Sequence, residues 1–187
     1  MLQWAMDSRR RIDSDLRREA GTTKGPKSLI SPNRVRDGRQ VRIFMNIRIT
    51  SFEKSERDIR IVRDTVFGQE QQVPRELDWD GKDPDCIHAV ATDDADHPIG
   101  TGRIQGDGRI GRLAVLAAWR GRGVGRRMLE QLVESARARA LEQVYLHAQI
   151  HTVLFYKKGG FEADGGEFTE ASIRHIRMTK NTQPMPE

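Results

Sequence analysis

Residues 118–130 read AWRGRGVGRRMLE, and glycine recurs there at positions 121, 123 and 125 before a helical pattern begins. The preceding residues 110–117, IGRLAVLA, have the apolar character of a strand. The first turn of a helix has backbone N–H groups without partners inside the helix, and the helix dipole adds positive charge there. Because glycine lets a ligand approach the backbone closely, this stretch predicts an anion site suited to phosphate or pyrophosphate.

Two common phosphate-binding motifs do not match this glycine turn, defined as residues 120–126. A P-loop needs four residues between its glycines and a following Lys-Ser or Lys-Thr pair. The dinucleotide fingerprint G-x-G-x-x-G is also absent, because the glycines here fall at every second position. Taken alone, the turn leaves open whether it binds a ligand or only allows a strand and a helix to pack tightly.

After residue 45 the patterns of strands and helices alternate, which predicts an α/β domain. Predicted strands cover residues 46–52, 86–91, 99–105, 109–116, 144–150, 161–163 and 173–178. Predicted helices cover residues 55–67, 123–140 and 152–158, with Ser55 as the N-cap of the first and a loop or short turns at 68–84. One apolar face of the central helix comprises Val124, Met128, Leu129, Leu132, Val133 and Ala136.

Composition places the chain among ordinary globular proteins. Its 187 residues suffice for one domain with a sizeable core. The single cysteine, Cys86, excludes an internal disulfide and favours a reducing compartment, so we expect a cytoplasmic protein. No apolar run approaches the roughly 20 residues of a membrane helix, and we expect no secretory signal and no membrane partner.

Positive charge is concentrated at the N-terminal end. Residues 1–44 carry 11 Lys and Arg against 5 Asp and Glu, whereas residues 45–187 carry 21 against 22. With few apolar residues, the first segment is predicted to be a disordered basic extension, and contact with nucleic acid or a partner is the alternative. Met45 opens the first predicted strand, and we expect the working protein to begin near it.

The glycine turn and a second motif together resemble the GNAT superfamily of N-acetyltransferases. Residues 120–125, RGRGVG, match that family's Q/R-x-x-G-x-G/A motif, which also follows a strand and opens an amphipathic helix. The segment FYKKGGF resembles the family's Y-x-x-x-G-F segment, with Tyr156, Gly160 and Phe161 in register. The resemblance covers roughly residues 45–180, and shorter segments within it are similar to a group of small bacterial GNAT proteins.

For the fold, the resemblance implies an α/β GNAT domain at residues 45–187. The implied sheet is central, mixed, mostly antiparallel and twisted, with about six to seven strands flanked by helices. It is splayed between its two central parallel strands, and acetyl-CoA binds there as cosubstrate, with no metal ion.

The resemblance also implies which residues hold acetyl-CoA. Backbone N–H groups of the glycine turn hold the pyrophosphate, and the strand before the turn pairs with the pantetheine arm. A bulge in that strand aims one amide at the thioester carbonyl and stabilises an oxyanion. Gln149 stands where many relatives have an asparagine. The implied contacts are Leu113, Ala114, Val115, Arg120, Gly121, Arg122, Gly123, Val124, Gly125, Arg126 and Gln149.

Catalytic residues are less well determined by the resemblance. Tyr156 aligns with the tyrosine that often protonates the departing CoA thiolate, and packing of a half-buried ring is its alternative role. No motif identifies the base that deprotonates the amine. For His175, a structural hydrogen bond in a strand is as open as a catalytic role. Glu70, Glu76 and Asp78 either bind a cationic amine or lie on a solvated surface. The candidate bases are Glu70, Glu76, Asp78, His88 and His175.

The expected activity is transfer of an acetyl group from acetyl-CoA to a primary amine of a small molecule or peptide, by direct attack in a ternary complex. Nothing around Cys86 indicates an activated nucleophile. One alternative is an inactive acyl-CoA-binding GNAT module that acts as a sensor or partner. A second is a nucleic-acid-binding protein, against which the near-neutral charge of residues 45–187 argues. Analogy with relatives leaves a homodimer open.

Overall fold

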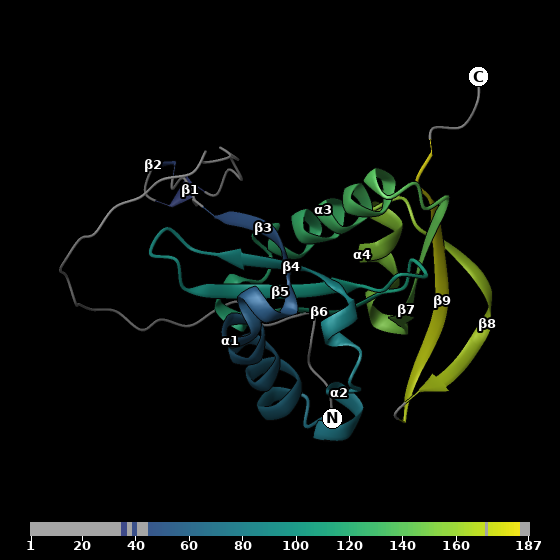
Figure 1. The fold of residues 1–187 in the computed structure, drawn as a ribbon, viewed down its shortest axis with the longest axis horizontal. Coiled ribbons are helices and arrows are strands. Elements are labelled where there is room, and N and C mark those ends of the chain that lie inside the picture. Colours follow the sequence, from purple (N-terminus) through teal and green to yellow (C-terminus); the bar gives the residue numbers. More distant parts are fainter. Residues whose placement is uncertain (1–34, 37–38, 41–44, 171, 184–187) are drawn as a thin grey trace.

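The computed structural model describes residues 35–36, 39–40, 45–170 and 172–183. Two larger antiparallel sheets and the helices around them make up the main part of the fold (Figure 1), which confirms the predicted α/β class. A four-stranded sheet has the order β3-β4-β5-β6, and a three-stranded sheet has the order β7-β9-β8. The strands of these two sheets are β3 (Asn46–Ser51), β4 (Ile87–Thr92), β5 (Pro98–Ile104), β6 (Ile110–Val115), β7 (Gln143–Gln149), β8 (Glu162–Glu170) and β9 (Ile173–Asn181).

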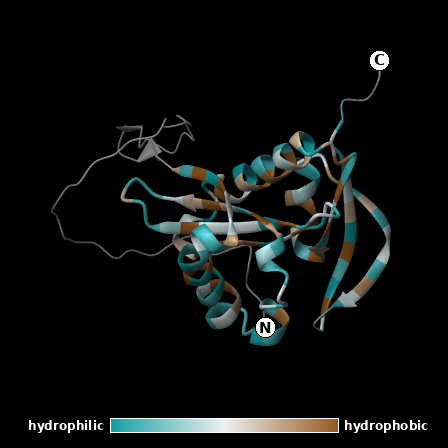
Figure 2. Cartoon of the chain, in the orientation of Figure 1, coloured by the Kyte–Doolittle hydropathy of each residue, from teal (hydrophilic) through white to brown (hydrophobic). Residues whose placement is uncertain are grey.

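Helices lie on both sides of the four-stranded sheet, with α3 on one face and α1 on the other (Figure 1). Both longer helices mix hydrophobic and hydrophilic residues, as Figure 2 shows. The helical segments are α1 (Phe52–Arg63), the π-helix η1 (Asp64–Glu70), α2 (Arg75–Asp78), the 3₁₀ helices η2 (Asp83–Asp85), η3 (Ala117–Trp119) and η4 (Ile150–Thr152), α3 (Val124–Ala138) and α4 (Val153–Lys158).

The core lies mainly between α3 and the sheets. All six residues of the apolar face predicted for this helix are buried, which confirms that pattern. Strands β4 and β5 are buried along nearly their whole length, because helices cover both of their faces. In β7, Val144, Leu146 and Ala148 are buried in the core, while the intervening residues are more exposed. Strand alternation therefore places Tyr145, His147 and Gln149 on the face that points away from α3.

Several predicted boundaries differ from the structure, and two of the differences have a clear physical cause. The first helix begins at Phe52, and Ser55 lies inside it at a kink, with φ −136° and ψ 18°. Its hydroxyl is 3.0 Å from the Thr50 hydroxyl, so this buried serine joins the strand to the helix instead of capping it. Strand β8 runs to Glu170, well beyond the predicted end at residue 163. Its residues have low strand propensity, but pairing with β9 keeps them in the strand conformation.

Gly108 lies where the two sheets meet. The bridge between them is parallel and joins Arg109 to Tyr145, and the Tyr145 amide donates to the Gly108 carbonyl at 3.1 Å. Gly108 has a φ of +86°, and an added Cβ would lie 2.7 Å from the Gln143 carbonyl oxygen. The junction therefore requires glycine for both its backbone conformation and its close contact.

We expect Gly108→Ala to reduce the free energy of unfolding by about 2 kcal/mol, because alanine strains this backbone conformation. Gly106→Ala is the matched control in the same turn, since the nearest atom to its Cβ is a side-chain nitrogen at 4.0 Å. Equilibrium unfolding in urea measures both variants. Equal stability of the two variants would contradict a special requirement at position 108.

The predicted extension at residues 1–44 lies largely outside the described residues. Within it, β1 (Val35–Arg36) and β2 (Arg39–Gln40) form an antiparallel pair. The side chain of Met45 is buried in the main core. In the part of the chain that the structure describes, no helix is long and apolar enough to cross a membrane.

Candidate active site

Strand β6 contains a bulge before the glycine turn. Its pairing with β5 passes from Thr101–Ala114 to Arg103–Gly111, so the register shifts between these pairs. Arg112 has a φ of 52°, which marks the bulged position. The Arg112 guanidinium donates to the carbonyls of Leu77 at 2.7 Å and Asp78 at 3.0 Å. These bonds fix the bulge to the C-terminal end of α2.

The glycine turn leads from η3 into α3 with open space beside its backbone. Gly121 and Gly123 have φ values of 70° and 83°, and no heavy atom would lie within 4 Å of a Cβ added to either. The Arg127 amide donates to the Gly123 carbonyl at 3.1 Å. By helix geometry, the amides of Val124 to Arg126 precede the first such bond and have no acceptor inside α3. The turn therefore presents backbone donors at an accessible helix start.

The arginines of the turn have different surroundings. Arg120 donates from Nε to the Val115 carbonyl at 2.9 Å and contacts both Glu70 carboxylate oxygens, at 2.7 and 2.5 Å. It therefore ties the end of β6 to η1. The Arg122 guanidinium lies 5.1 Å from the centre of the Trp119 ring. Arg126 donates to Glu130 at 2.8 Å within α3, on the exposed side of the helix.

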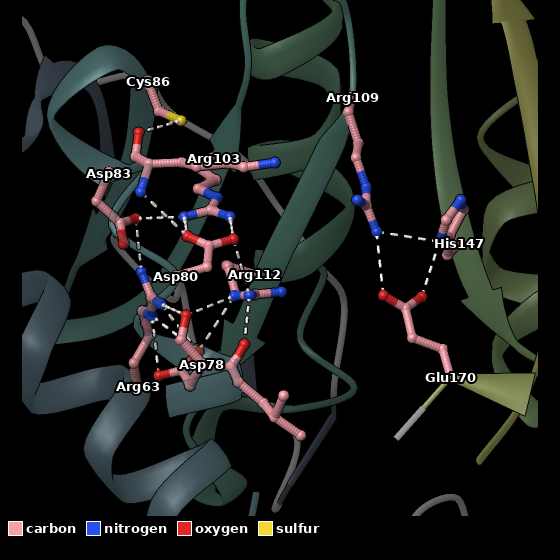
Figure 3. A network of polar contacts seen from close by, with 12 residues as sticks. Arg63, Asp78, Asp80, Asp83, Cys86, Arg103, Arg109, Arg112, His147 and Glu170 are labelled. Carbon is pink, nitrogen blue, oxygen red and sulfur yellow. Dashed lines mark hydrogen bonds and ion pairs between the residues drawn. The ribbon is translucent and has the colours of Figure 1, made fainter. Parts of the chain in front are cut away.

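A network of charges, of which Asp80 is exposed and the rest are buried, connects the helices below the sheet to β5 (Figure 3). Arg63 lies 2.9 Å from the Asp78 carboxylate and 2.7 Å from that of Asp83. Arg103 donates to Asp80 at 2.8 and 2.5 Å and lies 2.9 Å from Asp83. Burial raises the pKa of Asp80, but the hydrogen bonds and charge of Arg103 outweigh it and hold that pKa well below its usual range. The network therefore holds segment 78–83 against the sheet.

Removing one partner from this network should be strongly destabilising. We expect Arg103→Met to lower the free energy of unfolding by about 3 kcal/mol or more, because Asp80 and Asp83 lose a buried cationic partner. Glu134→Gln is the surface control, since Glu134 pairs with Arg137 on an exposed helix face. Urea unfolding of the two variants checks the difference. An Arg103→Met protein as stable as the control would show that the network contributes little.

Three of the residues predicted to bind the acceptor amine or to act as the base form ion pairs or hydrogen bonds within the fold. The carboxylates of Glu70 and Asp78 are paired with arginines, and His88 is buried with Nε2 3.1 Å from the Asp83 carbonyl. Burial lowers the pKa of His88. Glu76 is exposed and makes no ion pair with any residue that the structure describes. Their roles toward the acceptor stay predictions, which the geometry of Glu70, Asp78 and His88 does not favour.

Tyr156 lies on α4, which precedes the turn at Gly159 and Gly160. Its ring packs edge-on against Phe155 and Phe161, with centroids 4.9 and 6.1 Å away. Tyr156 is half-buried, and burial raises its pKa to about 12. The phenol therefore keeps its proton throughout the neutral pH range.

Arg109, His147 and Glu170 form a second polar cluster (Figure 3). It lies on the outward face of the three-stranded sheet, which is the face that points away from α3. His147 Nδ1 lies 2.8 Å from Glu170 Oε2, and Arg109 Nη2 lies 3.0 Å from the same nitrogen and 3.3 Å from Glu170 Oε1. Phe168 packs edge-on against His147 at 4.8 Å and stacks with His175 at 6.0 Å. The five side chains therefore form one continuous row across the sheet.

His175, predicted as a candidate base, is largely buried in this row. Its Nδ1 lies 2.8 Å from the Ile173 carbonyl, which only accepts, so Nδ1 carries the proton. It is the register partner of Gln149, which the resemblance assigns to the cofactor. The structure thus places His175 beside the predicted site, and its catalytic role stays a prediction. Among the described residues, no group of three or more His, Cys, Asp or Glu is arranged to hold a metal ion.

A family model for the acetyltransferase (GNAT) domain matches residues 56–182. The chain belongs to the GNAT family. The matched segment contains the bulged strand, the glycine turn, α4 and the outward row of the three-stranded sheet. The chain is therefore an acyl-CoA-dependent N-acyltransferase, as the resemblance of its two motifs implied.

Individual GNAT relatives agree with this assignment. The uncharacterized N-acetyltransferase YjcF of Bacillus subtilis (strain 168) is 34% identical over 137 residues, which cover 71% of this chain and 97% of YjcF. Among solved structures, Escherichia coli ElaA has a TM-score of 0.65 at 26% identity and covers 73% of this chain and 99% of its own. An acyl-CoA N-acyltransferase of Pseudomonas aeruginosa has a TM-score of 0.64 at 29% identity, with the same coverage.

The GNAT motifs did not reveal the cluster of Arg109, His147 and Glu170. No pattern in the sequence predicts a role for Arg109, His147 or Glu170. The available signal was the alternation of β7, which places polar side chains on one face of a strand whose other face is buried. It identifies the face but not the partners from β6 and β8.

Proposed function

We propose that this GNAT protein transfers the acetyl group of acetyl-CoA to a primary amine by direct attack in a ternary complex. The observation that carries the proposal is the open glycine turn at the start of α3, directly after a bulged strand. Its free backbone donors suit a diphosphate, and glycine leaves room for one. The donor set of the turn therefore fits coenzyme A.

Acetyl-CoA supplies an activated acyl group as a thioester. We assign its diphosphate to the amides from Gly121 to Arg126, with Arg122 and Arg126 adding positive charge. Leu113, Ala114 and Val115 of β6 offer backbone groups to the pantetheine arm in the splay between β6 and β7. One bridge between these parallel strands, at Arg109 and Tyr145, supports a splay beyond it. Gln149 would contact the cosubstrate from β7, and Arg120 braces the turn through Glu70.

Two groups act on the reacting atoms in this proposal. A backbone amide at the bulge of β6 donates to the carbonyl oxygen of the thioester, where negative charge develops. Tyr156 holds a proton at its hydroxyl oxygen and donates it to the departing sulfur. The pKa of about 12 keeps this proton available at neutral pH, although it also makes the phenol a weak acid.

Calorimetry with acetyl-CoA and a free-thiol assay over a panel of primary amines test the function. We expect binding of acetyl-CoA and CoA release that depends on an added amine. Binding without release on any amine would support the inactive acyl-CoA-binding module instead. Absence of binding to the folded protein would remove the basis of the proposal.

A further inference from the structure

His147 is held in one orientation by two charged groups from other strands. The Glu170 carboxylate only accepts hydrogen bonds and the Arg109 guanidinium only donates them, so they make opposite demands on Nδ1. Both contacts involve a charged partner, and the contact with the carboxylate is the shorter, 2.8 against 3.0 Å. Arg109 is satisfied by Glu170 Oε1 at 3.3 Å. The proton of a neutral His147 therefore lies on Nδ1, and Nε2 carries the lone pair.

The other ring nitrogen of His147, Nε2, has no hydrogen-bond partner among the residues that the structure describes. The His147 side chain is 25% exposed. Burial raises the pKa of Glu170, but the hydrogen bond from His147 and the charge of Arg109 outweigh it and keep that pKa below its usual range. An ionised carboxylate behind Nδ1 stabilises an imidazolium that forms when Nε2 takes up a proton.

Along the strands, His147 lies at about the level proposed for the thioester. His147 lies two residues beyond the bridge between Arg109 and Tyr145, which is about 7 Å along β7. The bulge at Arg112 lies three residues beyond the same bridge on β6. Because the two strands leave the bridge in parallel, the imidazole and the bulge are at similar levels.

We propose that His147 is the general base that deprotonates the acceptor amine through Nε2, with Glu170 and Arg109 as positioning residues. This assignment rests on the proposed acetyl transfer. Nε2 takes one proton from the amine as the new C–N bond forms and the C–S bond breaks. The sulfur takes one proton from the Tyr156 hydroxyl. His147 then releases its proton to solvent and Tyr156 regains one, so amine and thioester become amide and thiol.

The decisive variant is His147→Gln. With the most reactive amine among a blocked lysine peptide, spermidine, phenethylamine and kanamycin, we expect kcat to fall about 100-fold or more. The Kd for acetyl-CoA should change less than about threefold, because the base does not contact the diphosphate. His97→Gln is the matched control, since His97 lies in a turn with 76% of its side chain exposed, and it should keep full activity. Thermal unfolding confirms that both variants are folded.

The pH dependence of kcat/KM distinguishes a catalytic base from a histidine that only holds neighbouring strands together. The wild-type kcat/KM should rise with pH as the base loses its proton, and His147→Gln should lose this rise. The other charged or titratable groups facing this site are Glu170, Arg109, His175, Tyr145 and Arg177. Because His175 also has an imidazole side chain and could produce the same rise, the His175→Gln variant is measured in parallel. Loss of the rise in His175→Gln but not in His147→Gln would overturn the proposal.

Glu170→Gln tests the positioning role and covers the case in which His147→Gln does not fold. It removes the charge behind Nδ1 and keeps the side-chain shape, so kcat should fall about tenfold and the rise in the profile should move to lower pH. An unchanged profile in this variant would contradict the role of the carboxylate.

The ¹⁵N NMR spectrum of histidine-labelled protein tests the assignment without any acceptor. It should show His147 protonated at Nδ1, both alone and with acetyl-CoA, and a proton on Nε2 would overturn the proposal. If the wild type binds acetyl-CoA but releases CoA with none of the amines, the proposed transfer has failed for them. The NMR result does not depend on that failure, and a proton on Nε2 would still overturn the assignment of His147.

Discussion

Gly125→Glu is expected to abolish acetyl-CoA binding, with Kd raised about 100-fold or more. Gly125 is the second residue of α3, where the helix amides have no acceptor inside the helix. A carboxylate there competes with the diphosphate for those donors and repels its charge. Calorimetry with acetyl-CoA measures the affinity, and a circular dichroism spectrum verifies the fold.

Gly125→Ala is the control that distinguishes the effect of the negative charge from the effect of added side-chain volume. The atoms nearest to a Cβ at this position would belong to Phe155 and Val115, at 3.5 to 3.8 Å, which is ordinary van der Waals contact. Alanine should therefore leave Kd within about threefold of the wild type. Gly123→Glu should also abolish binding, but its φ of 83° adds backbone strain to the charge. Full affinity in Gly125→Glu would show that the diphosphate does not lie at the start of α3.

Tyr156→Phe is expected to lower kcat about 100-fold with little change in the Kd for acetyl-CoA. The variant keeps the ring that packs against Phe155 and Phe161 and loses only the hydroxyl that donates to the departing sulfur. A thiolate must then leave without a proton donor, while binding of the remote diphosphate is unaffected. The free-thiol assay gives kcat, and calorimetry gives the affinity.

Tyr145→Phe makes the same chemical change at the other tyrosine of the chain. The Tyr145 hydroxyl donates to Asp107 at 2.6 Å, so its loss removes a surface hydrogen bond and should change kcat less than about threefold. Equal rates in Tyr156→Phe and the wild type would reduce Tyr156 to a packing residue. A parallel loss in both variants would point to a general effect of losing a tyrosine hydroxyl.

Features that depend on residues close together in the sequence could be predicted. The helical repeat from Val124 to Ala136 identified the buried face of α3, because residues three and four apart share a side of a helix. Glycines before that repeat predicted an open helix start, and the structure has one. In the same way, alternation within a strand places His175 and Ile176 on opposite faces of β9. Ile176 packs against the main core, whereas His175 joins the outward row.

Features that depend on strand register could not be predicted. Arg109 and His147 are 38 residues apart, and Arg109 and Glu170 are 61 apart, yet they share one cluster. No local pattern says which strands pair or with what offset, and a shift of one residue would turn every side chain to the other face. The acidic segment illustrates the same point, because arginines from α1, β5 and β6 bind Asp78 and Asp80.

The residues alone were therefore sufficient for the α/β class, the helix that presents the glycine turn and the family to which the chain belongs. These properties are encoded in short stretches, where side-chain type and spacing decide which backbone conformation is stable. Tertiary contacts decided that Asp78 forms a buried ion pair with Arg63 and that the Glu170 carboxylate lies beside His147 Nδ1. Both outcomes depend on contacts between strands and helices distant in the chain, which form only when the sheets assemble.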